Sequence, residues 1–234
     1  MESAGFHTMQ RLDRYTGIAL LVTLLVYPAL YCSGIMGSII RPIFLEEGRM
    51  YWWLFWIVNI AFHLIPFTLV AIAMRQRNEQ WASIGLDWTW FVRGRWWLGA
   101  LLFFFVAGAW FLPGTYYGDQ LPRISGTIFL APVSKWERLF VVVASILVGF
   151  TEEFLFRGYA ITRLKQVMPV WVALFVSCVS FLFIHGTPRS IGHLFSYMTA
   201  GLFFGLPFVW NGFRRLELLI LVHILIDASM VLAP

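Results

Sequence analysis

Residues 150–158 read Phe-Thr-Glu-Glu-Phe-Leu-Phe-Arg-Gly, which places two carboxylates and one guanidinium inside a strongly apolar part of the chain. Apolar flanks extend back through residues 139–149 and forward through residues 159–164. An ionisable side chain at membrane depth costs from about 2.5 to roughly 10 kcal/mol or more. Because Glu152 and Glu153 carry this cost side by side, we interpret them as part of a site whose other members lie elsewhere in the chain.

The composition of the whole chain is that of a membrane protein. Of its 234 residues, 60% are hydrophobic and only 12% are charged, and the mean hydropathy is +0.76. A soluble domain normally contains about a quarter charged residues. We therefore predict an all-α, polytopic transmembrane bundle of about seven helices, within a range of roughly six to eight.

Seven apolar segments long enough to form membrane helices follow one another along the chain. They cover residues 16–40, 50–74, 96–112, 136–167, 170–185, 191–210 and 216–232. Pro28 is expected to kink the first segment, because proline removes a helical hydrogen bond. Gly201 and Gly205 form a G-x-x-x-G pair that permits close helix contact in the sixth. Cys32 and Cys178 both lie in apolar runs and are interpreted as inert thiols.

The basic residues predict which loops face the cytoplasm. The net charge of +5 lies in the connections between apolar runs, so we attribute it to the topology bias of membrane proteins and expect no nucleic-acid partner. With the N-terminus in the cytoplasm, the ten inner residues are Arg11, Arg14, Arg75, Arg77, Arg93, Arg95, Arg163, Lys165, Arg214 and Arg215. The five outer ones are Arg41, Arg49, Arg123, Lys135 and Arg189.

The charged stretch divides into a pair and a freer carboxylate. Glu153 and Arg157 are four residues apart with the acid first, the favoured arrangement for an ion pair on one helix face. Glu152 lies about 100° around the helix from Glu153 and is not served by that pair. We therefore predict a structural role for Glu153 with Arg157, and a chemical role for Glu152.

Polar residues on other apolar segments are candidates to meet Glu152. His185 ends one apolar run, and His223 and Asp227 share a face of the last segment because they are four residues apart. Such groups usually pair in the interior of a bundle, so we predict one joint site. His63, beside Asn59, is interpreted as a helix–helix hydrogen bond. Measured along their helices, Glu152 and His185 fall at different depths, a conflict that tilt, a break at Gly158 or a displaced fifth helix could resolve.

Three motifs in this order resemble the CAAX prenyl protease and bacteriocin-processing family of intramembrane endopeptidases. They are E-E-x-x-x-R at Glu152–Arg157, F-x-x-x-H at Phe181–His185 and H-x-x-x-N/D at His223–Asp227, and the resemblance covers about residues 139–229. It implies N-terminal transmembrane helices and loops in residues 1–135 and a catalytic core in residues 136–232.

The resemblance also implies a role for each residue of the site. Glu152 would activate a water molecule, assisted by His185, and His223 with Asp227 would stabilise the oxyanion. Glu153 and Arg157 would hold the site together. Asn often stands where this chain has Asp227, and an ionised carboxylate donates no hydrogen bond, so Asp227 could instead orient His223 or accept its proton.

The same residues would suit a metal ion. Two histidines with carboxylates are a plausible zinc set, which would here be Glu152, His185, His223 and Asp227. Because no H-E-x-x-H motif is present, we favour a mechanism without a metal or other cofactor and keep Zn²⁺ as the alternative.

Two other classes of function remain open on the sequence. Buried carboxylates also serve as proton or cation relays in transporters, and a non-catalytic immunity or scaffold protein could keep the same fold. For the peptidase we expect a peptide or protein substrate presented at the lipid bilayer. We expect the chain to lie in a bacterial cytoplasmic membrane.

Overall fold

The computed structural model describes residues 12–32, 49–87, 132–188, 190–210 and 215–232, and the regular structure there is helical throughout. Among these described residues, three helices are long and apolar enough to cross a membrane, and two shorter apolar helices accompany them. The prediction of an all-α bundle is confirmed in this form. The segment predicted at residues 96–112 lies outside the described residues, so the count of seven spans stays a prediction.

Two of the described helices contain a stretch of π-helix, and a third is followed by a short 3₁₀-helix. The first helix comprises α1 (Arg14–Leu21), the π-helical η1 (Val22–Val26) and α2 (Tyr27–Cys32). It is followed by α4 (Arg49–Gln76) and the 3₁₀-helix η2 (Trp81–Ile84). The next helix runs without interruption through α8 (Lys135–Glu152), the π-helical η3 (Glu153–Ile161) and α9 (Thr162–Leu164). The last three helices are α10 (Val170–Ile184), α11 (Ile191–Val209) and α12 (Leu216–Leu232).

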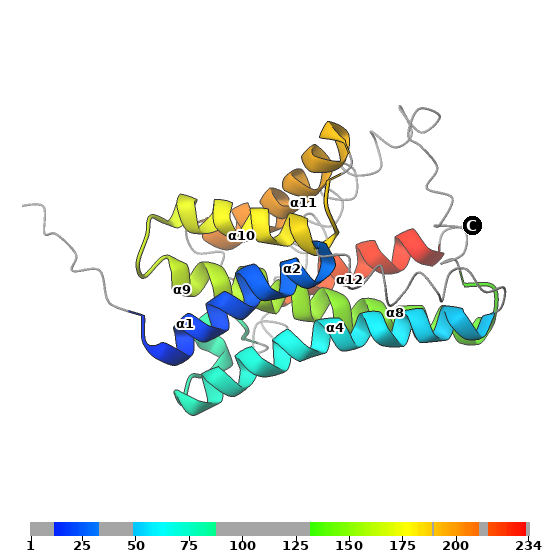
Figure 1. The fold of residues 1–234 in the computed structure, drawn as a ribbon, viewed down its shortest axis with the longest axis horizontal. Coiled ribbons are helices and arrows are strands. Elements are labelled where there is room, and N and C mark those ends of the chain that lie inside the picture. The colour runs from blue at the N-terminus through cyan, green and yellow to red at the C-terminus, as the bar shows by residue number, and fades with distance from the viewer. Residues whose placement is uncertain (1–11, 33–48, 88–131, 189, 211–214, 233–234) are drawn as a thin grey trace, which may run out of the picture.

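The helix that contains η3 forms the centre of the bundle. Every residue of η3 is buried, and η3 contacts α10, α12, α4 and α11 (Figure 1). Within the same bundle α8 lies between α4 and α12, while α10 lies against α11 and α2. The charged stretch that opened the sequence therefore occupies the interior of the molecule.

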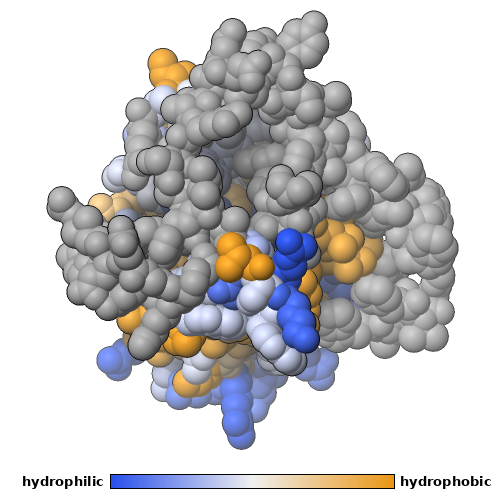
Figure 2. Space-filling model, turned by 90° about the vertical axis from the view of Figure 1, so that its right-hand side faces the viewer, coloured by the Kyte–Doolittle hydropathy of each residue, from blue (hydrophilic) through white to orange (hydrophobic). Residues whose placement is uncertain are grey.

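The outer faces of the helices are apolar, as expected for contact with lipid. Large hydrophobic side chains with at least half of their surface exposed include Leu25, Ile57, Ile65, Phe175 and Phe195. Exposed apolar surface on this scale is unusual for a soluble protein. At the end of the bundle where α8 begins, hydrophilic and hydrophobic side chains lie next to one another (Figure 2).

The polar connections meet at the opposite end of the bundle. Arg77, after α4, pairs with Asp13 before α1 and with Glu79. Arg163 in α9 also pairs with Glu79, and the first backbone N–H of α12 donates to the carbonyl of Gly85. Burial raises the pKa of Asp13, but hydrogen bonds from Thr16 and the charge of Arg77 outweigh it, so that the pKa is lowered. The described parts of the four segments that the charge count assigns to one side of the membrane thus lie together. That this side is the cytoplasm stays a prediction.

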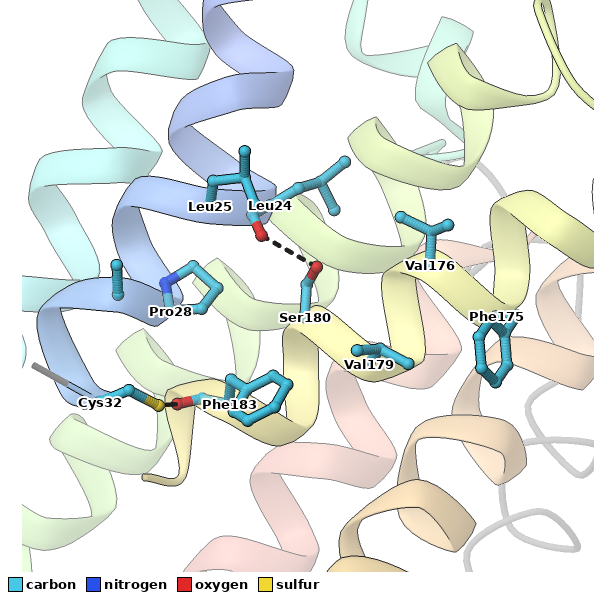
Figure 3. A pocket seen from close by; sticks show the side chains of 10 residues that line it. Leu24, Leu25, Pro28, Cys32, Phe175, Val176, Val179, Ser180 and Phe183 are labelled. Atoms are coloured by element: carbon cyan, nitrogen blue, oxygen red, sulfur yellow. Dashed lines mark hydrogen bonds between the residues drawn. The ribbon is translucent and has the colours of Figure 1, made fainter. Parts of the chain in front are cut away.

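Pro28 has a hydrogen-bonding consequence that reaches α10. Because proline has no N–H, the carbonyl of Leu24 loses its helical donor. The hydroxyl of Ser180 donates to this carbonyl over 3.0 Å, and the thiol of Cys32 donates to the carbonyl of Phe183 over 3.1 Å (Figure 3). The π-helical η1 ends two residues before Pro28, and the expected kink stays a prediction. Cys32 and Cys178 are both free thiols.

The uninterrupted central helix removes the conflict in depth between Glu152 and His185. Gly158 does not break it, and the helix continues from Glu152 to Leu164, about 18 Å at 1.5 Å per residue. His185 caps the end of α10, about 22 Å beyond Val170 by the same rise. Since α9 and the start of α10 adjoin one short connection, the two residues lie at similar depths.

Glycines allow the closest helix contacts. A Cβ on Gly201 would lie 3.2 Å from the Cβ of Cys178, so the predicted G-x-x-x-G contact exists and is made with α10. A Cβ on Gly149 would lie 3.1 Å from the backbone nitrogen of Ile224 in α12. Gly149 therefore sets how closely α12 approaches α8, next to His223.

Replacement of Gly149 by alanine should destabilise the protein by about 1–3 kcal/mol, because the added methyl presses against the backbone of α12. Thermal unfolding in detergent measures the change. Gly17→Ala is the matched control: a Cβ at Gly17 meets nothing within 4 Å, and alanine in a helix interior is better than glycine by about 0.5–1 kcal/mol. Equal melting temperatures for both variants would contradict the close approach of α12.

Candidate active site

The carboxylate of Glu153 links η3 to α12. Its Oε1 atom lies 3.0 Å from Nη1 of Arg157 and 2.8 Å from Nδ1 of His223. The imidazole is the donor in the second contact, because an ionised carboxylate can only accept. Glu153 and Arg157 are both almost completely buried. The predicted ion pair is confirmed, and it has a third member that fixes the orientation of His223.

Aromatic rings hold Arg157 on its other sides. The guanidinium lies over the ring of Phe181 in α10, 4.0 Å from its centroid, and 5.3 Å from the centroid of Phe204 in α11. Phe204 also stacks on the imidazole of His223, with 4.9 Å between the ring centroids. Stacking of a cation on an aromatic face is favourable in a desolvated setting. The ion pair is thus packed against both neighbouring helices.

Glu152 lies between two imidazoles. Its Oε1 is 3.6 Å from Nδ1 of His63 in α4, and its Oε2 is 3.7 Å from Nε2 of His223 in α12. The residue is 3% exposed, and among the described residues Oε2 has no hydrogen-bond partner. This is the freer of the two carboxylates, as the sequence predicted, because Glu153 makes both an ion pair and a hydrogen bond.

Asp227 joins the same cluster from one turn further along α12. Its Oδ1 lies 3.6 Å from Nε2 of His223, the nitrogen that also faces Glu152. The side chain of Asp227 is 28% exposed, against 7% for His223. Asp227 therefore lies where the cluster opens, and it is placed to orient His223.

His185 lies at the C-terminal end of α10, beside the same cluster. Its Nδ1 is 3.0 Å from the carbonyl of Phe181, and its ring packs on Tyr197 of α11 with 4.2 Å between centroids. Donation from Nδ1 to that carbonyl assigns the acceptor role to Nε2. Its predicted part in activating water is not tested by this geometry and stays a prediction.

His63 is a neighbour of Glu152 that the sequence analysis did not assign to the site. The expected helix–helix hydrogen bond is present, because Nδ1 of His63 bonds the hydroxyl of Tyr27 in α2. The same nitrogen faces Glu152, however, so His63 is part of both the helix–helix contact and the candidate site. The signal was available in the sequence, since Asn59 and His63 are four residues apart on one apolar segment, as are Tyr27 and Tyr31 on another.

Two adjacent glutamates are both buried because the central helix is buried on all sides from Thr151 to Leu164, and its π-helical stretch η3 lies in this part. Each turn of π-helix is wider than an α-helical turn, and such turns occur often at functional sites. The change of hydrogen-bond pattern begins at Glu153. The hydroxyl of Ser177 in α10 donates over 2.7 Å to the carbonyl of Phe156 within this segment. A neighbouring helix thus helps to satisfy backbone groups in the interior, as membrane proteins require.

The metal hypothesis concerns the donor atoms around Nε2 of His223. Oxygens of Glu152 and Asp227 lie 3.7 and 3.6 Å from it, a little wider than the roughly 3.3 Å between donors bound tetrahedrally to one zinc ion. Within the described part of the chain, no three His, Cys, Asp or Glu side chains are placed to hold a metal ion. The mechanism without a metal stays a prediction.

Comparison with known proteins agrees with the motifs. Residues 134–229 match the family model described as Type II CAAX prenyl endopeptidase Rce1-like. These residues are a domain of that family. No curated protein and no solved structure matches the chain.

The family is one of proteases, so a protein substrate is implied. The matched region runs from the N-cap of α8 to within α12 and therefore contains Glu152, Glu153, Arg157, His185, His223 and Asp227. Tyr27 and His63 lie outside it. Together with the apolar helices, the family indicates an integral membrane protein.

Removal of Arg157 should be severely destabilising. Arg157→Met leaves the Glu153 carboxylate buried without its cation, which typically costs about 3–5 kcal/mol. The double variant Arg157→Met/Glu153→Gln removes both charges and should recover most of the loss. The free energies of unfolding of the single and double variants in detergent give the coupling energy between Glu153 and Arg157. Arg138→Met, at an exposed position of α8, is the control, and an Arg157→Met protein as stable as this control would refute the role of the pair.

Proposed function

We propose that the protein is an intramembrane endopeptidase that hydrolyses a peptide bond at or near the membrane, with Glu152 as the general base. The observation that carries the proposal is the position of Glu152: a buried carboxylate with one uncommitted oxygen, held between two imidazoles inside a membrane bundle. In proteins without bound substrate, catalytic hydrogen bonds are often long and tighten in the complex. Distances of 3.6–3.7 Å to the imidazoles agree with this.

The reaction requires one proton to pass through Glu152. The carboxylate takes a proton from water, assisted by His185, and the resulting hydroxide adds to the scissile carbonyl carbon. The carbonyl oxygen becomes an oxyanion. Glu152 then returns the proton to the peptide nitrogen as the C–N bond breaks, so that the base is regenerated with each turnover.

His223 is suited to stabilise the oxyanion. Its Nδ1 is committed to Glu153, so Nε2 is the edge that faces Glu152 and Asp227, where the reacting group would lie. When the ring is protonated, Nε2–H can donate to the developing negative charge. Asp227 orients this edge and, if it carries a proton, adds a second donor.

We propose that this chemistry needs no metal and that the N-terminus faces the cytoplasm of a bacterium. The first proposal is supported by the absence of an H-E-x-x-H motif from the sequence. The alternative is a Zn²⁺ ion held by Glu152, His185, His223 and Asp227. The second proposal is supported by the basic segments that lie together at one end of the bundle.

Glu152→Gln should lower kcat by at least about 10²-fold, the lower range of general-base contributions. The measurement is cleavage of a reporter peptide library by purified protein in detergent. Glu137→Gln is the matched control, because Glu137 is also a buried carboxylate of α8 but serves the capping box with Ser134, a role that glutamine can fill. Wild-type cleavage by Glu152→Gln would remove the catalytic assignment.

A strong chelator separates the two mechanisms. Under the metal-free mechanism, cleavage persists after treatment with chelator and is lost only in the Glu152 variant. Loss of cleavage on chelation, with recovery on addition of Zn²⁺, would favour the metal site.

Asp227→Asn should retain cleavage within about tenfold of the wild type, while Asp227→Leu should lose about 10²-fold or more, as when an oxyanion donor is removed. Asparagine keeps an acceptor for His223 and gains an amide donor, whereas leucine has neither. The measurement is the steady-state cleavage rate of each variant on the same reporter peptides, compared with the wild-type rate. If Asp227→Asn is as inactive as Asp227→Leu, the negative charge is required and the oxyanion role of Asp227 is wrong.

A further inference from the structure

The polar side chains of α2 and α4 form a second cluster on the His63 side of Glu152. Tyr27 is completely buried and His63 is 4% exposed. Both helices precede the family domain at residues 134–229. Buried polar groups in a membrane bundle are expensive and usually functional, yet the reaction as derived above gives these residues no role.

We propose that His63, held by Tyr27 and Tyr31, is a positioning residue that fixes the carboxyl group of Glu152 for catalysis. The proposal rests on the proposed role of Glu152 as general base. It adds to that role a device supplied by the part of the chain outside the family domain.

Hydrogen bonds fix the orientation of the His63 ring. The hydroxyl of Tyr31 lies 3.2 Å from Oδ1 of Asn59 and 3.4 Å from Nε2 of His63, and its one proton can serve either acceptor. An ionised carboxylate can only accept, so His63 holds Glu152 with its own proton on Nδ1 while Tyr31 donates to Nε2. Nδ1 then faces both the hydroxyl oxygen of Tyr27 and Oε1 of Glu152. The two tyrosines thus fix the orientation of the ring.

Aromatic packing fixes Tyr27 in turn. Its ring stacks on Phe156 of η3 with 6.1 Å between centroids, and meets the ring of Tyr31 edge-on at 5.5 Å. Phe156 is four residues beyond Glu152 on the same helix. The network therefore begins and ends on the segment that carries the general base.

The result is that the two oxygens of Glu152 face two different imidazoles. Oε1 faces His63 and Oε2 faces His223, and both rings are themselves held by further hydrogen bonds. A carboxyl group bracketed in this way cannot rotate without losing one neighbour. Misplacement of a catalytic group by about 1 Å can cost 10²-fold in rate, so loss of the bracket should lower kcat more than it changes KM.

The test compares three replacements of His63 that differ in where they place a polar group. The amide of asparagine lies close to the position of Nδ1, that of glutamine close to Nε2, and leucine has no polar group. We expect kcat to fall about 10- to 100-fold in His63→Leu. The fall should be equally large in His63→Gln and smaller in His63→Asn. KM should stay within about threefold of the wild-type value in all three variants. If His63 only packs, the kcat values of the three variants should follow the order of their melting temperatures. That result would overturn the proposal.

Tyr27→Phe tests the hydroxyl that holds the ring. It should lower kcat about tenfold, the effect of losing one hydrogen bond of about 1.4 kcal/mol. Tyr159→Phe is the matched control, since Tyr159 is an equally buried tyrosine of η3 that packs near Arg163, away from Glu152. Equal activity of the two variants would count against the proposal.

A measurement without substrate distinguishes a failure of this proposal from a failure of the proposed peptidase function. In protein labelled with ¹⁵N at its five histidines, the resonances of His63 are those lost in His63→Asn. Both Glu152→Gln and Tyr27→Phe should shift them, and unchanged resonances would overturn the proposal. An active Glu152→Gln protein would refute the proposed function instead. Inactive Glu152→Gln with fully active His63 variants would refute the positioning role alone.

Discussion

The buried charge of Glu153 is the constraint that the interior of this protein satisfies. One carboxylate oxygen pairs with the charge of Arg157 and accepts a hydrogen bond from His223, so a single atom ties the central helix to the last one. Arg157 in turn lies on aromatic rings of α10 and α11. Four helices are thereby placed with respect to each other around one negative charge, whose isolation in an apolar interior would be prohibitive.

This arrangement separates the two glutamates by function. Glu153 pairs with Arg157 at 3.0 Å and accepts from His223 at 2.8 Å, whereas the imidazole nitrogens beside Glu152 lie 3.6 and 3.7 Å from its oxygens. Each carboxylate keeps one oxygen without a hydrogen-bond partner among the described residues. Both face the interior because the central helix is buried on all sides here, and the hydroxyl of Ser177 donates to the carbonyl of Phe156 within it. The chemical distinction between two identical neighbouring side chains therefore arises from their contacts with other helices.

The helices were largely predictable from the sequence, but the details of their interior were not. The predicted segments at residues 50–74, 170–185, 191–210 and 216–232 agree with α4, α10, α11 and α12 within one or two residues at each end, because polar connections interrupt long apolar runs. The π-helical turns were missed, since a run that is buried on all sides shows no periodicity from which 3.6 residues per turn could be told from a wider turn. In the site, charge spacing predicted the pair of Glu153 with Arg157. His63 was considered as an isolated residue, and its proximity to Glu152 depends on tertiary packing that no local pattern records.

The hydrogen bond from Ser180 to the carbonyl freed by Pro28 has a consequence for how such chains are compared. The serine lies inside the region that defines the family and the proline lies outside it, just as Glu152 lies inside and His63 outside. An alignment restricted to the domain sees only one member of each pair. Variation at Ser180 would look arbitrary there, although it should follow the presence of a proline about 150 positions earlier. The structural unit within which these side chains find their partners is thus larger than the segment that matches the family.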